Sequence, residues 1–337
     1  MNCDIIIPVW DQFEFTRDCI ESVIKNTTVL YRLIIIDNGS GEPTKKYLEG
    51  LKGEKSAEII IARNDENIGF VKAVNQGIAL STAPYICLLN NDTIVIKDWL
   101  EIMIDAAGSS GDIGIVNPSS NTLGKRPSEG ESIESYAEKL KVSPVKYVEL
   151  GSAVGFCMLI KREVIDRIGA FDEIYGMGNF EDTDFSRRAI RDGYKSARAV
   201  RAYVYHREKA SFGKRKTFEE DFSRNREIYE FRWGRPRRIA YVIESEDENI
   251  LKRLEAESLK LARSGNWIYY LSKNKISVPG HSNIILWLSP ERMFYSRLLL
   301  KVLTKKKRFD EIFVGNEHLG RMLEYLAFIH RAKVGYY

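Results

Sequence analysis

The chain has 337 residues, 44% of them hydrophobic, and a formal net charge of +4. No stretch approaches the roughly 18 to 20 uninterrupted apolar residues of a membrane span, and the opening MNCDIIIPVW lacks the order of a signal peptide, so we expect a cytoplasmic protein. A single core seldom grows to this length, which favours two domains.

Strand and helix patterns alternate from the amino terminus. An apolar, β-branched run over residues 5–9, which we expect Pro8 to terminate, precedes a helical pattern over 15–25 and a strand over 33–36. Further strands are predicted over 59–62 and 85–89, with a helix over 71–80 between them. This alternation predicts an α/β fold with a mainly parallel sheet covered by helices.

Polar residues follow three of these predicted strands. They are Asp11, Asp37 and the run Asn90 to Asp92. In parallel sheets the ligand crevice lies beyond the carboxyl ends of the strands. We therefore expect these three strand ends to converge on one site.

The second half of the chain divides again. A polar, loop-like region spans 119–143, an apolar block runs over 151–160, and a glycine-rich segment leads to a helix expected near Glu181. Gly234 and Pro236 mark a boundary, after which strands are predicted over 239–243, 267–271, 284–288 and 311–314. We thus expect one domain over 1–235 and a small α/β domain over 236–337.

The four cysteines lie far apart among apolar neighbours and never form a Cys-x-x-Cys pair. This spacing predicts buried thiols and neither a zinc site nor a disulfide framework. The residues are Cys3, Cys19, Cys87 and Cys157.

Positive charge is concentrated in residues 187–238, which hold 17 Lys or Arg against 7 Asp or Glu. Aromatic residues such as Phe212 and Trp233 are interleaved there. The pattern suits nucleic acid, a diphosphate-bearing substrate or an anionic membrane surface, and the alternative is a solvated basic face.

Five motifs occur in order along residues 3–235: IIIPVWDQ, IIIDNGSGEPT, NIGFVKAVNQGI, LLNNDT, and NFEDTDFSRRA followed by VYH. Together they resemble the family 2 glycosyltransferases of the GT-A fold. The resemblance implies a Rossmann-like domain that transfers a sugar with inversion from a UDP- or dTDP-sugar to a hydroxyl of a glycan or lipid-linked acceptor. It favours surface polysaccharide synthesis, peripheral contact with the inner face of an anionic membrane, and no nucleic-acid partner. LLNNDT and EDTDF are similar to rhamnosyltransferase-type members.

The resemblance assigns the nucleotide to several of these motifs. Asp37 is expected to accept the imide N–H of uracil or thymine, although an Asx-turn from Asp37 to Ser40 is an alternative that is compatible with this role. The other residues expected to bind the donor are Pro8, Asp11, Asn67, Gly69, Asn75 and Asn90.

Asp92 is the expected ligand of Mn²⁺ or Mg²⁺, since oxygen ligands favour these ions and a divalent cation neutralises a departing diphosphate. Asn90 replaces the first acid of the family's Asp-x-Asp motif. His206 follows a strand where a family histidine can complete the metal site, and a structural hydrogen-bonding role is the alternative.

Asp182 is expected to be the catalytic base, which removes the proton of the acceptor hydroxyl. Glu181 is expected to orient the acceptor or the base, and Asp184 to support the helix and nearby arginines. The alternative is a helix amino terminus capped by Asp182 or Thr183. The small residues of 151–156 resemble the family's segment beneath the donor sugar, or else form a tightly packed strand.

Two rival functions stay open. A sugar nucleotidyltransferase shares the nucleotide site, but its usual glycine-rich phosphate loop is missing from IIIPVWDQFEF. A non-catalytic glycan-binding or assembly subunit is supported by Asn90 and opposed by Asp92 and Asp182. Residues 308–335 are faintly similar to part of heptosyltransferase-like GT-B enzymes, which leaves a truncated half-domain, a docking module or a plain appendage for the tail.

Overall fold

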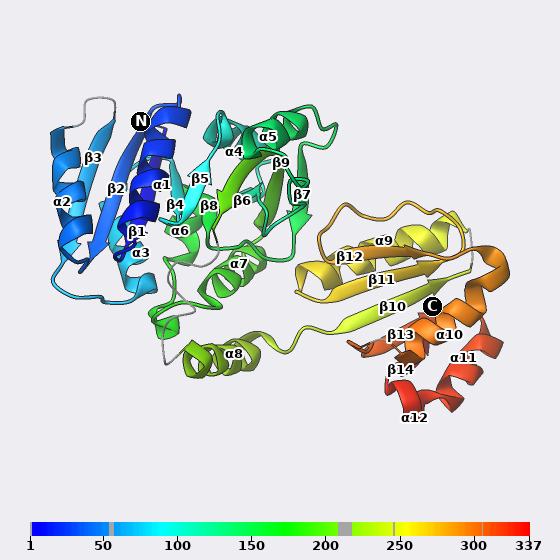
Figure 1. Ribbon diagram of the computed structural model, residues 1–337. Coiled ribbons are helices and arrows are strands. Elements are labelled where there is room, and N and C mark those ends of the chain that lie inside the picture. Colours follow the sequence, from blue (N-terminus) through cyan, green and yellow to red (C-terminus); the bar gives the residue numbers. More distant parts are fainter. Residues whose placement is uncertain (1, 54–56, 208–217, 245–246, 305) are drawn as a thin grey trace. The chain divides into compact units, whose positions relative to one another are not determined.

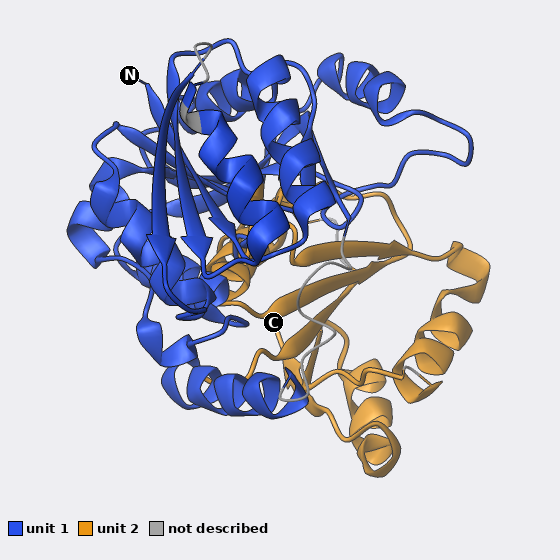
Figure 2. Cartoon of the chain, turned by 60° about the vertical axis from the view of Figure 1, so that its left-hand side comes forward, with its two compact units in different colours: residues 1–148, 152–233 blue, residues 149–151, 234–337 orange. Residues whose placement is uncertain are grey.

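A computed structural model describes residues 2–53, 57–207, 218–244, 247–304 and 306–337. It divides into two compact units, drawn in different colours in Figure 2. Unit 1 holds residues 1–148 and 152–233, and unit 2 holds residues 149–151 and 234–337. The part of the basic segment that falls in 208–217, Phe212 included, lies outside the described residues.

Unit 1 contains the elements from β1 to α8 (Figure 1). Its strands are β1 (Cys3–Val9), β2 (Tyr31–Asn38), β3 (Glu58–Asn64), β4 (Tyr85–Leu89), β5 (Thr93–Val95), β6 (Ile113–Ser119), β7 (Tyr147–Leu150), β8 (Cys157–Lys161) and β9 (Lys195–His206). Its helices are α1 (Phe13–Asn26), α2 (Glu42–Gly50), α3 (Phe70–Leu80), α4 (Trp99–Ala107), α5 (Ile133–Lys141), α6 (Arg162–Ile168), α7 (Glu181–Arg191) and α8 (Phe218–Trp233).

The sheet of unit 1 runs in the order β3-β2-β1-β4-β8-β6-β9-β5, with β7 paired to β9. Strands β3, β2, β1 and β4 are mutually parallel, and β8 is antiparallel to both β4 and β6. This confirms the α/β class and the mainly parallel sheet around the candidate site.

Both faces of this sheet are buried, which explains its continuous runs of isoleucine. Ile5 and Ile7 of β1 belong to the core cluster on one face, whereas Ile6 belongs to the cluster on the other. Gly77 of α3 meets Ile6 so closely that a Cβ would overlap its side chain. The backbone of α3 therefore packs directly against β1, and this contact fixes the position of the helix on the sheet.

Three expectations about this unit are wrong in detail. Pro8 does not end β1, because the strand runs on to Val9 while pairing with β4 stops at Ile6, so the missing N–H breaks no bond on that side. The region 119–143 contains α5, whose single buried residue, Ala137, gives little apolar periodicity.

The alternative of a packed strand over 151–156 is also wrong, since β8 begins at Cys157. The backbone here bonds to side chains instead of to a neighbouring strand. Asn117 Nδ2 donates to the carbonyl oxygen of Val154 at 2.7 Å, and Asp182 accepts the N–H of Gly155 at 2.8 Å. These bonds hold the segment as a loop.

Unit 2 is a second α/β unit with a five-stranded, wholly parallel sheet in the order β12-β11-β10-β13-β14. One core cluster joins the sheet to α10 and α11, and another joins it to α9. The elements are β10 (Arg238–Ile243), α9 (Glu248–Arg263), β11 (Trp267–Ser272), β12 (Ile284–Leu288), α10 (Phe294–Thr304), β13 (Glu311–Val314), α11 (Glu317–Tyr325), α12 (Ala327–His330) and β14 (Lys333–Tyr336).

All four cysteines are buried and free, as expected. Among the described residues, no helix combines the length and apolar character that crossing a bilayer requires.

Candidate active site

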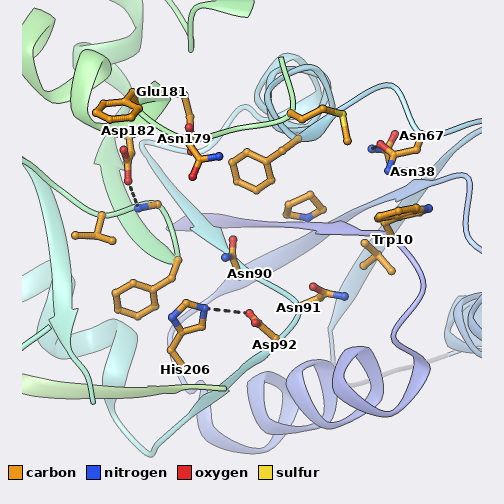
Figure 3. Close-up of a pocket in the computed structure, with 18 of the residues that line it drawn as sticks. Trp10, Asn38, Asn67, Asn90, Asn91, Asp92, Asn179, Glu181, Asp182 and His206 are labelled. Carbon is orange, nitrogen blue, oxygen red and sulfur yellow. Dashed lines mark hydrogen bonds and ion pairs between the residues drawn. The ribbon is translucent and has the colours of Figure 1, made fainter. Parts of the chain in front are cut away.

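A cavity of about 570 Å³ lies in unit 1, beyond the carboxyl ends of β1, β2 and β4 (Figure 3). Strand ends from β1 and β4, the loop before α3, the loop before β8 and the start of α7 all contribute to it. It is lined by Pro8, Val9, Trp10, Asn38, Asn67, Phe70, Asn90, Asn91, Asp92, Val154, Gly155, Phe156, Met177, Asn179, Phe180, Glu181, Asp182, Thr183, His206 and Phe222.

Seven of the eleven residues singled out from the sequence line this cavity. They are Pro8, Asn67, Asn90, Asp92, Glu181, Asp182 and His206. The other four, Asp11, Asp37, Gly69 and Asn75, are not among its lining residues.

Asp37 is almost fully buried at the end of β2. Its Oδ1 accepts the N–H of Ser40 at 2.9 Å, so the Asx-turn is present, and its Oδ2 pairs with the guanidinium of Arg63. Asp37 and Arg63 are register partners on β2 and β3. The carboxylate is thus charge-balanced within the protein.

Asp11 ties the end of β1 to the same turn. Its N–H donates to Ser40 Oγ at 2.9 Å, and its Oδ1 accepts the N–H of Gly41 at 2.7 Å. Asp11 has a left-handed backbone, with φ of 54°. These bonds fix the two loops that follow β1 and β2 relative to each other.

Asn38 and Asn67 organise the loop that enters α3. Asn38 Nδ2 donates to Asn67 Oδ1 at 2.8 Å, and Asn67 Oδ1 also accepts the N–H of Gly69 at 2.9 Å. Gly69 has φ of +95°, and an added Cβ would lie 3.1 Å from the carbonyl oxygen of Gly176. Glycine is therefore required here by both conformation and space.

Asn75 serves the backbone of another loop. Its Nδ2 donates to the carbonyl oxygen of Phe171 at 2.9 Å, and its Oδ1 accepts the N–H of Phe171 at 3.1 Å. The Asn75 amide thus holds the loop at Phe171 in both directions, and its expected part in donor binding stays a prediction.

Asp92 and His206 are neighbours in the cavity wall, with Oδ1 of Asp92 and Nε2 of His206 3.3 Å apart (Figure 3). The imidazole stacks on Phe156 at 5.0 Å between ring centroids, and Asn121 bonds the backbone of His206 in both directions, at 2.8 Å each. Apart from its contact with His206 Nε2, Asp92 Oδ1 has no hydrogen-bond partner in the structure, and His206 Nδ1, on the other side of the ring, is buried without one. Asp92 Oδ1 and His206 Nε2 are therefore the two atoms that face each other and could share a cation.

The described residues contain no group of three or more His, Cys, Asp or Glu side chains that could hold a metal ion. A cation at Asp92 and His206 would therefore take its remaining ligands from amide or backbone oxygens, from the substrate or from water. Asn90 lies beside this pair and brings no charge, as its replacement of an acid implied.

Glu181 and Asp182 open α7 at another side of the cavity. Asp182 Oδ2 accepts the N–H of Gly155, and Asp182 Oδ1 accepts the N–H of Thr183 at 2.6 Å and its hydroxyl at 3.1 Å. Burial raises the pKa of Asp182, and these donors counteract the rise by stabilising the carboxylate. We infer that Asp182 is the ionised member of the pair.

Glu181 is 6% exposed, and its Oε2 is buried without a hydrogen-bond partner. Burial, followed by the charge of Asp182, raises the pKa of Glu181 from 4.5 to about 8. At neutral pH the pair therefore holds one carboxylic acid beside one carboxylate.

The turn before α7 is strained. Asn179 and Phe180 both have left-handed backbones, with φ of 75° and 71°, which is rare for an aromatic residue. Phe180 is the residue that precedes the helix, so neither Asp182 nor Thr183 is the N-cap. Outliers of this kind cluster at functional sites, where surrounding structure holds them in place.

Helix α8 provides that support. Asn225 is buried, and its Nδ2 lies 2.9 Å from the carbonyl oxygen of Tyr175, 2.8 Å from that of Gly178 and 3.3 Å from that of Asn179. Phe222 packs against Phe180 with 5.2 Å between ring centroids and lines the cavity.

Asp184 joins α7 to α8, in agreement with its expected supporting role. Its carboxylate is fully buried and contacts Arg188 at 3.0 Å, Arg232 at 2.8 Å and Trp233 Nε1 at 2.8 Å. Since its charge is matched by two arginines, Asp184 has a structural environment and does not face the cavity.

Several residues of the cavity wall were not expected from the sequence. Trp10 and Phe180 belong to the quoted motifs, where an apolar side chain beside a polar strand or loop end is the signal that could have marked them. Phe222 stood out only as one of the aromatic residues of the basic segment, and Asn225, which supports the wall from behind, carried no local signal.

Residues 4–169 match the sequence model of Glycosyl transferase family 2. Glycosyltransferase AglE of Haloferax volcanii is 24% identical over 199 residues, which cover 56% of this chain and 62% of that protein. The chain spans 26% and 62% of the lengths of the first two curated relatives that it matches.

Two solved structures have a similar fold. Residues 1–349 of S. aureus TarS in complex with UDP-GlcNAc share 13% identity and a TM-score of 0.52, covering 79% of this chain and 74% of that one. Mannosyltransferase PcManGT from Pyrobaculum calidifontis, in complex with GDP-Man and Mn²⁺, shares 15% identity and a TM-score of 0.50, covering 64% of this chain and 58% of that one.

Proposed function

We propose that this chain is an inverting glycosyltransferase of family 2, because residues 4–169 match the sequence model of that family and unit 1 has a GT-A fold. It transfers a hexosyl or deoxyhexosyl group from a UDP- or dTDP-sugar to a hydroxyl of a glycan or lipid-linked acceptor. Surface polysaccharide synthesis at the inner face of the membrane is the process that we propose for it, within a catalytic domain over 1–235.

One observation carries the proposal. A single cavity holds a charge-binding pair, Asp92 and His206, and a separate buried carboxyl pair, Glu181 and Asp182 (Figure 3). A departing nucleoside diphosphate needs its negative charge neutralised, whereas an attacking hydroxyl needs its proton removed. The cavity offers a group for each need, and the two groups lie at different places on its wall.

Asp182 is the proposed base. The acceptor oxygen attacks the anomeric carbon, the bond from that carbon to the diphosphate oxygen breaks, and the hydroxyl proton passes to a carboxylate oxygen of Asp182. Gly155 and Thr183 hold this carboxylate in place. Glu181, protonated at neutral pH, can donate a hydrogen bond to the acceptor or to the neighbouring carboxylate.

Asp92 and His206 would hold Mn²⁺ or Mg²⁺, because Asp92 Oδ1 and His206 Nε2 face each other 3.3 Å apart at the cavity. When bound, such a cation would neutralise charge that develops on the departing diphosphate. The presence of Mn²⁺ with GDP-Man in a protein of similar fold supports this assignment. Asn90 is proposed to bond a ribose hydroxyl beside the metal.

The nucleotide is proposed to occupy the part of the cavity that Pro8, Trp10 and Asn67 line. Asp37 would accept the base imide from the end of β2, while Asp11 and Gly69 shape the loops. A uridine nucleotide in TarS and a guanosine nucleotide in PcManGT show that similar folds take different bases. The donor's base is therefore the first property to determine.

The test is turnover with a panel of UDP-, dTDP- and GDP-sugars, with and without Mn²⁺, read as release of nucleoside diphosphate. We expect release with a uridine or thymidine donor, together with a raised melting temperature in the presence of its nucleotide. Nucleotide binding without turnover on any acceptor would favour the assembly subunit. Formation of a nucleotide-sugar from a sugar phosphate would favour the nucleotidyltransferase. Indifference to every nucleotide would refute both enzymes and favour the glycan-binding subunit.

A further inference from the structure

In unit 2, two separate segments come to the same end of the sheet. All strands are parallel, so β13 and β14 begin at one end, and the segments that precede them both arrive there. Helix α10 leads into β13, and α11 and α12 lead into β14 (Figure 1). Helices α10 and α12 also contact each other. The end of α10 and the whole of α12 are thus neighbours.

These two segments carry positive charge only. Residues 300–309 and 325–334 together contain seven Lys or Arg and no Asp or Glu. Five of these cations are described and exposed: Lys306, Lys307, Arg308, Arg331 and Lys333. Within the described part of the chain, no acid forms an ion pair with any of the five. Their charge is therefore available to an external anion.

Large apolar side chains are exposed at the same end of the sheet. Tyr325 is 79% exposed, Phe328 73% and Leu300 61%, and Ile329 on α12 is exposed beside them. Neighbours on the same helices are buried: Leu298 and Val302 on α10, for example. The exposed side chains thus occupy the outer face of helices whose inner face is already packed.

Hydrogen bonds of His330 hold α12 in place, so the exposure of its apolar side chains is part of the folded structure. His330 is 1% exposed, its Nε2 lies 2.9 Å from the carbonyl oxygen of Leu323, and its Nδ1 accepts the N–H of Ala332 at 3.0 Å. Leu323 is itself part of the core of unit 2. With His330 anchored, Phe328 and Ile329 are held outward.

We propose that one surface of unit 2 docks on an anionic lipid bilayer. This surface, here called the α10–α12 surface, consists of Leu300, Lys306, Lys307, Arg308, Tyr325, Phe328, Ile329, Arg331 and Lys333. Charge complementarity supports this occupant, because each Lys or Arg near an anionic leaflet contributes about 1 kcal/mol. The aliphatic side chains of Leu300 and Ile329 favour lipid over RNA, since they gain from hydrocarbon and not from a phosphate backbone.

This inference deepens the proposed function and, as a route to a lipid-linked acceptor, rests on it. As a lipid-binding property it stands independently of catalysis. It also differs from the expectation attached to residues 187–238, because it places the lipid contact in unit 2.

The experiment is sedimentation of the full chain with vesicles of phosphatidylcholine alone, or with about a third of the lipid replaced by phosphatidylglycerol. We expect binding only to the anionic vesicles. The double variant Lys306→Glu/Lys307→Glu should lower the partition coefficient at least about tenfold. The double variant Tyr325→Ser/Phe328→Ser should lower it as well, and should make the remaining binding more sensitive to salt.

The matched control is Lys252→Glu/Arg253→Glu, which makes the same charge change on exposed positions of α9. It should bind like the wild type. Equal loss in control and test variants, or no binding to anionic vesicles at all, would overturn the proposal, and so would binding to single-stranded RNA in place of vesicles. Melting curves verify folding of each variant. Turnover on a water-soluble acceptor should be unchanged in all variants, so a failure of catalysis is recognised separately.

Discussion

The carboxylate of Asp182 accepts the backbone N–H of Gly155 at 2.8 Å, which places a residue without a side chain directly in front of the proposed base. A Cβ at position 155 would lie 3.5 Å from Asp182 Oδ2 and 3.5 Å from Glu181 Oε1, an ordinary contact distance. The glycine therefore leaves open the space from which an acceptor hydroxyl approaches.

Gly155→Ala should accordingly fold normally and transfer sugar slowly. We expect turnover to fall by about 10- to 100-fold, because a methyl group would displace the acceptor from a geometry in which about 1 Å matters. Steady-state kinetics measure this, with Gly111→Ala, at an open surface position, as control. Unchanged turnover would show that the acceptor approaches from elsewhere.

Asp182→Asn should lower turnover by roughly 10²- to 10⁴-fold, since the amide cannot accept the acceptor proton. Donor affinity should barely change, because Asp182 is not one of the residues proposed to bind the nucleotide. Parallel measurement of turnover and of nucleotide binding separates the two effects. Near-normal turnover would instead make Glu181 the first candidate for the base.

Asp92→Asn should weaken Mn²⁺-dependent binding of the nucleoside diphosphate by about tenfold or more, because a charged interaction of about 1.5–3 kcal/mol is lost. Binding without metal should stay nearly the same. Calorimetric titration with UDP or dTDP, with Mn²⁺ and with excess EDTA, makes the comparison. Full wild-type activity in excess EDTA would remove both Asp92 and His206 from a metal role.

Glu181 makes stability depend on pH. Its pKa is raised from 4.5 to about 8, so between these values the folded state keeps a proton that the unfolded state releases. The free energy of unfolding should therefore fall as pH rises from about 4.5 to about 8. Glu181→Gln should flatten this fall, as measured by urea unfolding across the window, while exposed Glu163→Gln should not. Parallel curves for wild type and Glu181→Gln would contradict the assignment.

Asn225→Ala should loosen the strained turn before α7, since it removes the amide that bonds the carbonyl oxygens of Tyr175, Gly178 and Asn179. We expect a stability loss of about 1–3 kcal/mol and a lower turnover with little change in donor affinity. Glu227→Ala, on the exposed face of the same helix, is the control. A loss of stability alone, with turnover intact, would show that the turn does not position Glu181 and Asp182.

The sequence predicted the sheet well because the signal for its strands is local. Apolar, β-branched runs marked β4, β12 and β13 at the bounds that the structure gives, and the polar run Asn90 to Asp92 after β4 located the cavity. Helix α5 was not predicted, because it lies on the surface and its one buried residue gives no apolar periodicity.

What the sequence did not predict depends on contacts between distant segments. The pairing of Asp37 with Arg63 follows from the register of β2 and β3, which no local pattern specifies. The hydrogen bonds from Asn225 to the turn before α7 depend in the same way on where α8 packs, which no local pattern specifies. The left-handed backbone at Phe180 contradicts the usual preference of aromatic residues, so local rules argue against it.

Phe180 also limits which substitutions in the cavity wall evolution can accept. Glycine at this position would relieve the backbone but remove the ring that packs on Phe222 and Tyr229, and a β-branched residue would suit the left-handed conformation even less. Phe222, by contrast, lies within a regular helix and accepts most side chains without backbone cost. Changes in the width of the cavity are therefore more accessible to evolution at position 222 than at position 180, and a search for altered acceptor preference should vary that helix first.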